Sequence, residues 1–322
     1  MQFLPHPLLP NGHLQTLAGL LGQSRLGRKE SAILWRVPLA DGDQLVLHDD
    51  CPEAWRPGDR SALLIHGLAG CHASPYMRRT AEKLNRRGVR TFRLDLRGCG
   101  AGQGLSRLPY HSGRSADAAA ALEKIAELCP GSRTSLIGFS LGGNIALKLL
   151  GESAAALPGH LDRAVAVCPP VDLAACVDSL KRGLGRWYDR HFVNLLLAQL
   201  ASQRRLLPDS PMLARGIRPR GIREFDDAFT APVCGFGTAA NYYKECSAAQ
   251  FIRQVQVPTL ILAAADDPLI PAAIFAKIGR SSAVELCLTG SGGHLGYIGR
   301  RNGDPDRRWM DWRIVDWVRN EE

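Results

Sequence analysis

Short apolar segments alternate with helical patterns along most of this chain, and no other feature limits its possible folds as strongly. Most of these segments are short and apolar at consecutive positions, which is typical of a β-strand buried on both faces. Strands that alternate with helices form a mostly parallel, twisted sheet with helices on both faces, so we predict an α/β fold. The predicted strands are residues 61–66, 90–95, 133–139, 163–168, 258–263 and 283–288, and the predicted helices among them are residues 74–87, 115–128 and a segment that begins at Leu141.

Residues 31–49 precede this alternation and have a different pattern. Two strand-like segments flank Asp41 and Gly42, and an Asp-Gly pair favours the tight turn of a β-hairpin. We therefore expect an antiparallel lead-in to the sheet.

The alternation stops between Pro169 and Gln256. This region has Pro-rich joints between three helical patterns, at residues 172–182, 187–207 and 241–253. We interpret residues 172–255 as a helical cap insertion over the carboxyl edge of the sheet, where α/β proteins bind their ligands.

Composition and charge exclude several classes of protein. With 45% hydrophobic and 22% charged residues, the chain has enough apolar area for a globular core. The net charge is +9, but the Lys and Arg residues are scattered, so we expect no nucleic-acid partner. Prolines interrupt the densest basic stretch, which favours a solvated loop over an anion-binding surface. That stretch contains Arg204, Arg205, Arg215, Arg218, Arg220 and Arg223.

The cysteines and the N-terminal residues indicate the compartment. Nine cysteines without a Cys-x-x-Cys pair suggest reduced thiols rather than disulfides or a thiolate zinc site. Residues 1–16 have no positive segment before an apolar one, and Pro5, Pro7 and Pro10 interrupt any short signal helix. No segment has about 18 consecutive apolar residues, the length that a membrane span requires. We expect a cytoplasmic protein without a membrane span.

Residues Gly138 to Gly142 match the pattern G-x-S-x-G between a predicted strand and a predicted helix. In this context the two glycines allow a sharp turn that exposes the Ser140 hydroxyl above the sheet. A Gly-rich turn with a capping serine is the structural alternative. The flanking strand and helix favour Ser140 as a nucleophile.

A serine hydroxyl requires a base to remove its proton and a carboxylate to orient that base. Asp266 and Asp267 follow the predicted strand 258–263, and His294 lies in a glycine-rich loop after strand 283–288. We predict Asp267 as the orienting acid because it begins an Asp-Pro-Leu-Ile-Pro turn, with Asp266 as a possible cap of that turn. His294 is the predicted base.

His66 and His72 lie outside the loop in which the base is expected, and we interpret both as structural residues.

The loop of residues 66–70 (HGLAG) follows a strand and is expected to meet the turn at Ser140. The amide of Leu141, which follows the nucleophile, and that of Leu68 are the predicted oxyanion-hole donors. An ordinary strand-ending turn is the alternative for residues 66–70.

A second glycine cluster, residues 98–104, resembles a nucleotide-binding loop at first sight. Gln103 occupies a position where G-x-G-x-x-G requires glycine, and no helix starts directly after the cluster. Nucleotide binding is therefore not expected.

Taken together, these motifs resemble those of the α/β-hydrolase superfamily, and more closely those of its YheT-like branch, the AB hydrolase-4 family. The residues that carry the resemblance are NGHLQT at 11–16, HGLAG at 66–70, GFSLGGN at 138–144, ADDP at 265–268 and GGH at 292–294. Residues 93–100 (RLDLRGCG) also resemble the Asp-x-Arg-Gly-x-Gly loop of the superfamily, which implies a structural role for the second glycine cluster.

The resemblance implies a single α/β-hydrolase domain over residues 1–322. It implies a serine esterase of carboxylic esters that acts through Ser140, Asp267 and His294 without a metal or organic cofactor. The expected partner is a small-molecule ester or a lipid-like substrate. Eukaryotic members are commonly membrane-anchored and act on acylglycerols or phospholipids, and this chain lacks their N-terminal anchor, so we expect a cytoplasmic enzyme.

Several alternatives remain open at this stage. The same triad supports acyl transfer to an alcohol if water is excluded, and a hydrolase fold also serves as a non-catalytic binding scaffold. Asn11 and Thr16 are expected to cap a short helix beside the pocket. Apolar residues of the insertion form either an acyl pocket or the core of the insertion, and these are Trp187, Phe192, Leu195, Leu196 and Leu197.

Overall fold

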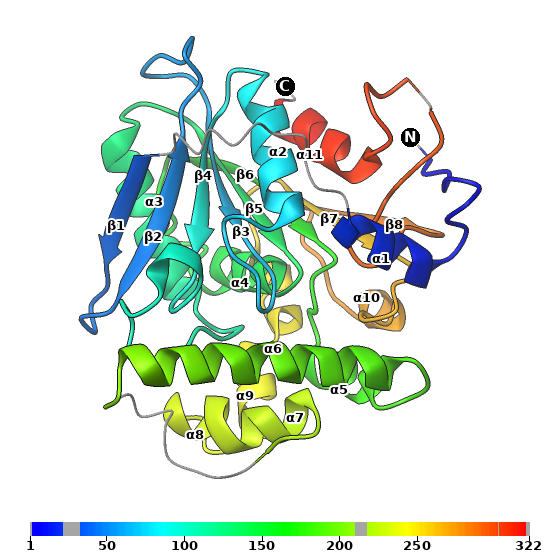
Figure 1. Ribbon diagram of the computed structural model, residues 1–322. Helices are drawn as coiled ribbons and strands as arrows, with labels where there is room; N and C mark the ends of the chain where they lie inside the picture. Colours follow the sequence, from blue (N-terminus) through cyan, green and yellow to red (C-terminus); the bar gives the residue numbers. More distant parts are fainter. Residues whose placement is uncertain (1, 22–32, 210–217, 302, 320–322) are drawn as a thin grey trace.

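A computed structural model describes residues 2–21, 33–209, 218–301 and 303–319. In this structure eight strands form one sheet in the order β1-β2-β4-β3-β5-β6-β7-β8 (Figure 1). The strands are β1 Ile33–Pro38, β2 Gln44–Asp50, β3 Ser61–Ile65, β4 Arg90–Asp95, β5 Thr134–Phe139, β6 Leu161–Val167, β7 Thr259–Ala264 and β8 Val284–Thr289. All six strands predicted for the alternating region are present, and the α/β fold is confirmed.

Strand direction follows from the connections. β3 to β8 pair in parallel, because a helical segment separates each from the next along the chain. β2 pairs antiparallel with both β1 and β4, and Gly42 adopts a φ of 85° in the turn between β1 and β2. The predicted hairpin is confirmed, although its first two positions, 31 and 32, lie outside the described residues.

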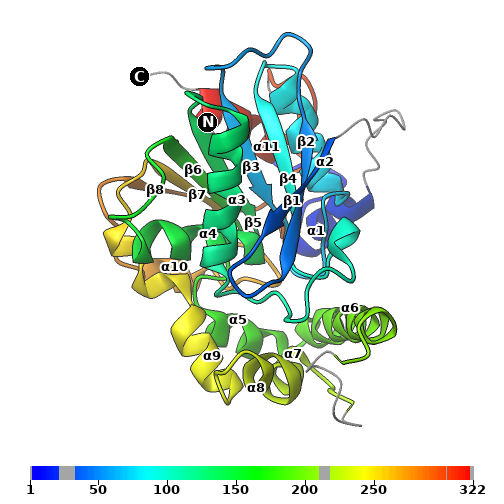
Figure 2. The ribbon, with the colours of Figure 1, turned by 90° about the vertical axis from the view of Figure 1, so that its left-hand side faces the viewer.

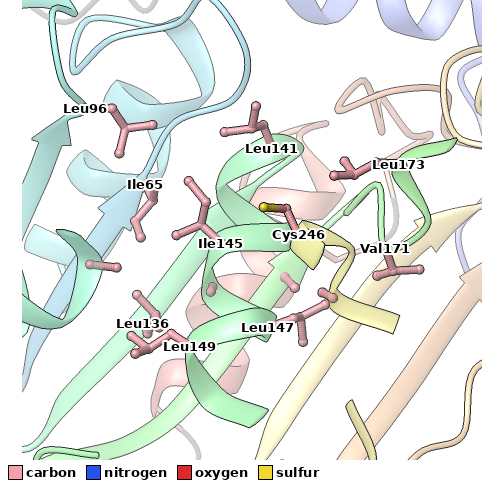
Figure 3. Close-up of a cluster of buried hydrophobic side chains, with 14 of the residues drawn as sticks. Ile65, Leu96, Leu136, Leu141, Ile145, Leu147, Leu149, Val171, Leu173 and Cys246 are labelled. Atoms are coloured by element: carbon pink, nitrogen blue, oxygen red, sulfur yellow. The ribbon is translucent and has the colours of Figure 1, made fainter. Parts of the chain in front are cut away.

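Apolar side chains on alternate strand positions build a core on each face of the sheet. Leu63 and Ile65 of β3 belong to the core cluster beneath α3 (Ser115–Leu128) and α4 (Leu141–Glu152), part of which Figure 3 shows. Leu64 of β3 points to the opposite face and packs with α2 (Pro75–Asn85) and α11 (Trp309–Arg319). Helices therefore cover both faces of the sheet, as Figure 2 shows.

β8 differs from the prediction of a strand buried on both faces. Its residues are mostly half-buried or exposed, because β8 lies at the edge of the sheet and pairs only with β7. The sequence pattern does not distinguish this edge strand from the central strands, since its composition is similarly apolar.

Helices occupy the chain between β6 and β7 and lie across the carboxyl ends of the parallel strands (Figures 1 and 2). They are α5 Leu173–Leu180, α6 Gly185–Leu206, α7 Ile222–Phe225, the π-helix η3 Asp226–Thr230, α8 Ala231–Val233 and α9 Ala239–Cys246. Arg215 of the basic stretch lies outside the described residues.

The single helical pattern predicted at residues 241–253 is wrong in one respect. α9 ends at Cys246, and two 3₁₀ turns follow, η4 at Ala248–Gln250 and η5 at Ile252–Gln254. Ser247 lies between α9 and η4 and is extended, with a ψ of 124°, and its hydroxyl donates to the Tyr243 carbonyl and accepts from the Leu173 amide. These side-chain hydrogen bonds compete with the helical ones and end the helix.

Three further helical elements complete the described chain. They are α1 Gly12–Leu21, η1 Gly100–Gly102 and α10 Ala273–Ala276. None of the helices in the described ranges has both the length and the apolar character needed to cross a lipid bilayer.

Candidate active site

Ser140 sits at the sharp turn between β5 and α4. Its φ of 51° and ψ of −120° lie outside the region that L-residues prefer. The turn is possible because two neighbours lack a side chain: a Cβ on Gly138 would lie 2.3 Å from the Gly142 carbonyl oxygen, and one on Gly142 would lie 2.4 Å from that of Ile65. Close backbone packing therefore maintains a strained serine above the sheet.

Three predicted site residues meet at this turn although they are far apart in the sequence. The Ser140 Oγ lies 2.9 Å from His294 Nε2, and His294 Nδ1 lies 2.8 Å from Asp267 Oδ2. An ionised carboxylate only accepts hydrogen bonds, so Nδ1 carries the proton and Nε2 is left to accept from the serine hydroxyl. This arrangement can remove a proton from Ser140.

The two adjacent aspartates have different contacts. Asp267 is buried, and its Oδ1 accepts hydrogen bonds from the Leu269 and Ile270 amides at 2.8 and 3.1 Å, which orient Oδ2 toward the imidazole. Asp266 Oδ1 accepts from the Gly293 amide at 2.9 Å. Burial raises the pKa of Asp266. The structure thus brings Asp267 to His294 and uses Asp266 to fasten the histidine loop.

Helix α1 also holds that loop, a role that the sequence analysis did not identify. The Thr16 hydroxyl donates to the Gly12 carbonyl at 2.7 Å and accepts from the His294 amide at 2.8 Å. A Cβ on Gly293 would lie 2.3 Å from the Gly12 carbonyl oxygen, so this contact requires glycine. The predicted cap is confirmed for Asn11, whose Oδ1 accepts from the Leu14 amide, and is wrong for Thr16.

Gln15 adds a second connection between α1 and the chain after His294. Its side chain is fully buried, donates to the Ile298 carbonyl and accepts from the Ile298 amide at 2.7 Å. The concentration of polar residues in NGHLQT was the only sequence feature that could have indicated this role. A local pattern does not reveal a contact such as that between Thr16 and His294, which are 278 positions apart.

The loop of residues 66–70 leaves the Leu68 amide available beside Ser140. The Gly67 amide donates to the Tyr76 hydroxyl, the Ala69 amide to the Tyr110 hydroxyl and the Gly70 amide to the Gly67 carbonyl. Within the described chain neither the Leu68 nor the Leu141 amide has a hydrogen-bond partner. Both residues line the same cavity as Ser140, so two unengaged backbone donors are available near the hydroxyl.

His66 supports this loop. It is fully buried, its Nδ1 lies 2.7 Å from the Gly67 carbonyl, and its Nε2 lies 3.3 Å from the Leu96 amide. These partners require a neutral ring that donates from Nδ1 and accepts at Nε2, and burial lowers the pKa of His66 accordingly. The structural interpretation of His66 is consistent with these contacts.

His72 belongs to a second buried cluster, around Asp95 at the end of β4. Asp95 Oδ2 lies 2.9 Å from His48 Nε2 and 2.8 Å from His72 Nδ1, and it also accepts from the Ala101 amide. Burial alone would raise the pKa of Asp95, but the hydrogen bonds from His48 and His72 outweigh it and hold the pKa well below its usual range. A Cβ on Gly100 would lie 2.3 Å from the carboxylate, which explains the glycine cluster structurally.

Asn144 of α4 connects the nucleophile helix to the helical segment. Its side-chain amide donates to the Ser112 and Cys246 carbonyls, and its carbonyl oxygen accepts from the Ala248 amide. All three bonds are buried, so Asn144 fixes the chain after α9 relative to Ser140.

A cavity lies between the sheet edge and the helices α5 to α9. It holds about 1140 Å³ of free space, including open solvent at its mouth, and Ser140 and His294 lie in its wall. Most of the wall contributed by α5 and α6 is apolar, and its residues include Leu173, Cys176, Val177, Phe192, Leu196 and Leu200. An apolar cavity with a few polar groups is the usual form of a small-molecule site.

The structure divides the apolar residues that we considered for an acyl pocket. Phe192 and Leu196 line the cavity, whereas Trp187 and Leu195 are exposed and Leu197 packs against the core. Of that set, Phe192 and Leu196 therefore belong to the cavity wall and Leu197 to the packed interior.

Comparison with known proteins identifies the family. A family model described as alpha/beta hydrolase fold matches residues 63–300. The chain is 34% identical to the putative esterase YheT of Escherichia coli over 98% of this chain and 93% of that protein. It therefore belongs to the α/β-hydrolase family. Its similarity to YheT over nearly the full length of both chains makes it a YheT-like member.

More distant relatives carry esterase and lipase names. The medium-chain fatty acid ethyl ester synthase/esterase 2 of Saccharomyces cerevisiae is 27% identical over 74% of this chain. Phospholipase ABHD3 of Mus musculus is 27% identical over 81% of it. The chain spans 58% and 65% of these two proteins, less than two thirds of each.

Solved structures of hydrolases share the fold at low sequence identity. The 2,6-dihydroxy-pseudo-oxynicotine hydrolase aligns with a TM-score of 0.59 and 16% identity over 95% of this chain and 72% of its own. The Pyrococcus furiosus esterase Pf2001 aligns with a TM-score of 0.57 and 16% identity over 92% and 96%. These similarities concern the fold alone.

Proposed function

We propose that this protein is a serine esterase that cleaves carboxylic esters through an acyl-enzyme intermediate. The observation that carries the proposal is the continuous chain of hydrogen bonds from Ser140 through His294 to Asp267 in the wall of an apolar cavity. The esterase and lipase names of the relatives also support ester hydrolysis.

In the first half of the proposed reaction, the Ser140 Oγ attacks the ester carbonyl carbon while His294 Nε2 takes the hydroxyl proton. The carbonyl oxygen becomes an oxyanion that accepts from the Leu68 and Leu141 amides, and one such donor is worth about 3 to 4 kcal/mol of transition-state stabilisation. The tetrahedral intermediate then expels the alcohol, which leaves with the proton from His294.

In the second half, a water molecule attacks the acyl-enzyme and gives a proton to His294 Nε2. The second tetrahedral intermediate expels Ser140, which recovers its proton from His294, and the carboxylic acid is released. Asp267 keeps His294 in the tautomer that both halves require, because it accepts from Nδ1 throughout.

The arrangement of the chain is part of the same proposal. Residues 172–255 act as a cap of a single domain over residues 1–322, and their apolar wall encloses the substrate chain. The buried bonds of Asn144 to the region after α9 support a cap that is held to the nucleophile helix. We further propose a cytoplasmic location, which the nine unpaired cysteine thiols favour.

Acyl transfer to an alcohol is the second candidate. The yeast relative named as an ethyl ester synthase and esterase supports it, because an alcohol can replace water in the attack on the acyl-enzyme. Product analysis in mixtures of water and ethanol distinguishes the two reactions: transfer predominates if the ethyl ester forms faster than the acid.

The test is hydrolysis of p-nitrophenyl esters from acetate to palmitate by the wild-type protein and by Ser140→Ala. We expect the variant to lose about 10⁴-fold or more in kcat while it keeps the thermal unfolding midpoint of a folded protein. Equal turnover by the two proteins would contradict the proposal, and the absence of turnover on any ester would support a binding scaffold instead.

A further inference from the structure

One carboxyl group in the cavity wall has no role in the proposed reaction. Asp226 is the first residue of the π-helix η3, is buried, and lines the same cavity as Ser140 and His294. π-helical turns are rare and are often found at functional sites. Asp226 therefore places an acidic group within a largely apolar substrate cavity.

The partners of Asp226 differ from those of the other buried acids. Seven aspartates are buried in the described chain, and six of them lie within 4 Å of an Arg, Lys or His nitrogen. These six are Asp43, Asp49, Asp95, Asp117, Asp267 and Asp311. Asp226 has no such cation among the described residues, although buried charges are normally paired.

Asp226 instead contacts hydroxyl groups. The Tyr243 hydroxyl donates to its Oδ2 at 2.7 Å, and Tyr242 and Thr230 line the cavity beside it. Burial raises the pKa of Asp226 to about 7, and the hydrogen bonds from Tyr243 and Thr230 oppose this rise only in part. Asp227 and Asp189 raise it further because they are like charges.

Other ionisable groups around this position do not supply a counter-charge. Arg223 lies over the Tyr243 ring and is 3.7 Å from Asp178, and the Cys234 thiol has its own pKa raised by burial. Arg97 also lines the cavity, but its guanidinium contacts Asp41, Asp43 and Asp117. The carboxylate thus keeps acceptor capacity beyond its hydroxyl neighbours.

We propose that Asp226 and Tyr243 form a polar subsite that binds a hydrogen-bond donor, an amine or a hydroxyl, on the substrate chain. This inference rests on the proposed function, because the same substrate must place its ester at Ser140. The donor group of the substrate would be the partner of Asp226, as an Arg, Lys or His side chain is the partner of each other buried aspartate. A hydrogen bond to a charged group is worth about 10- to 100-fold in binding, so the subsite selects functionalised esters over plain alkyl esters.

The experiment compares matched p-nitrophenyl esters of equal chain length that end in a methyl, a hydroxyl or an ammonium group. A second set carries the same end groups on the alcohol side, so that either position of the chain is tested. We expect wild-type protein to show a higher kcat/KM for a donor-ended ester than for its methyl-ended partner. Asp226→Asn should lower that ratio about 10-fold.

The matched control is Asp227→Asn. Asp227 is adjacent and exposed and does not line the cavity. The ratios are measured at least one unit above the pKa of Asp226, where that carboxyl group is charged with or without the Asp227 charge, so Asp227→Asn should leave the ratio at the wild-type value. If Asp226→Asn does not fold, Asp226→Leu provides a second test, with the ratio shifted toward the methyl-ended ester.

The outcomes separate this inference from the proposed function. Turnover of the methyl-ended ester by wild-type protein tests the esterase proposal. The ratio of kcat/KM for the donor-ended ester to that for the methyl-ended ester tests the subsite, because general damage to the site lowers both values equally. If Asp226→Asn and Asp227→Asn give the wild-type ratio in both substrate sets, the polar subsite is wrong even though the esterase proposal stands.

Discussion

Two buried Asp-His clusters lie at the carboxyl edge of this sheet, and only one of them has the geometry for catalysis. In the first, His294 contacts Asp267 with one ring nitrogen and the Ser140 hydroxyl with the other, at the cavity wall. In the second, His48 and His72 both contact Asp95, and their rings stack with centroids 3.4 Å apart. The comparison shows that an Asp-His contact alone does not make a catalytic base. The second ring nitrogen must also contact a hydroxyl group that lines a cavity.

The largest expected effect is on the first cluster. Asp267→Asn should reduce kcat about 10⁴-fold, because an amide in place of the carboxylate favours the wrong imidazole tautomer. The measurement is steady-state hydrolysis of a p-nitrophenyl ester. Asp266→Asn is the matched control, and its kcat should fall by less than about 10-fold because Asp266 fastens the loop without contacting the ring. A larger loss in Asp266→Asn than in Asp267→Asn would reverse the assignment.

The second cluster should instead affect stability. Asp95→Asn leaves the buried His48 ring and the half-buried His72 ring without their carboxylate and should lower the free energy of unfolding by about 3 kcal/mol. Denaturant unfolding at neutral pH measures this loss, and kcat per folded molecule should stay near the wild-type value. A large loss of kcat in Asp95→Asn without a loss of stability would contradict the inference that this cluster is structural and that the cluster at His294 is catalytic.

The stability that Asp95 contributes should depend on pH, and the direction of that dependence follows from its pKa. The pKa of Asp95 is lower in the folded state than in the unfolded chain, so its contribution to stability is present above the unfolded value of about 4. That contribution decreases as the pH falls below the unfolded value, and it is lost once the pH has passed below the pKa of Asp95 in the folded state. The stability difference between wild-type protein and Asp95→Asn should therefore shrink as unfolding is measured at progressively lower pH.

A smaller effect is expected when the support of His294 is weakened. Thr16→Val removes the hydroxyl that accepts from the His294 amide and should lower kcat about 10- to 100-fold through misplacement of the imidazole. Thr16→Ser retains the hydroxyl and should recover most of the activity. If KM rises while kcat is unchanged, Thr16 acts on substrate binding and not on the position of His294.

The smallest effect concerns Asp226. Below its pKa of about 7 the carboxyl group is neutral, and above it the group is charged. The preference for an ammonium-ended over a methyl-ended ester should therefore rise with pH, by up to about 10-fold between one unit below and one unit above the pKa. Any pH dependence that the two esters have in common cancels in the ratio. Asp226→Asn should give a ratio that is independent of pH.

The sequence predicts those parts of the site that depend on local backbone geometry. Gly138 and Gly142 are visible in a five-residue pattern because the turn at Ser140 excludes any Cβ at both positions. The sequence also predicts that the loops with Ser140, Asp267 and His294 lie close together, because parallel strands bring their carboxyl ends to one edge of the sheet. For this reason the sequence alone predicts Ser140, Asp267 and His294 as neighbours at one site.

The remaining features depend on contacts that no local pattern encodes. Thr16 meets His294 across 278 positions, and Asp226 lies in a π-helix within a segment for which no helical pattern was predicted. The break at Ser247 arises from a side-chain hydrogen bond to the Leu173 amide, again a long-range contact. Periodicity therefore identifies the strands and the helices α5, α6 and α9, but not the helical residues 222–233 or the way in which the helical segment lines the cavity.

The junction between α1 and the His294 loop has a kinetic consequence. Its contacts join residues near opposite ends of the chain, and the glycines at 12 and 293 leave no room for an approximate fit. Contacts of such high sequence separation form slowly, because the entropy of closing the intervening loop opposes them. During refolding from denaturant, recovery of esterase turnover should therefore lag behind the recovery of tryptophan fluorescence, because the proposed site is complete only when α1 has met the His294 loop.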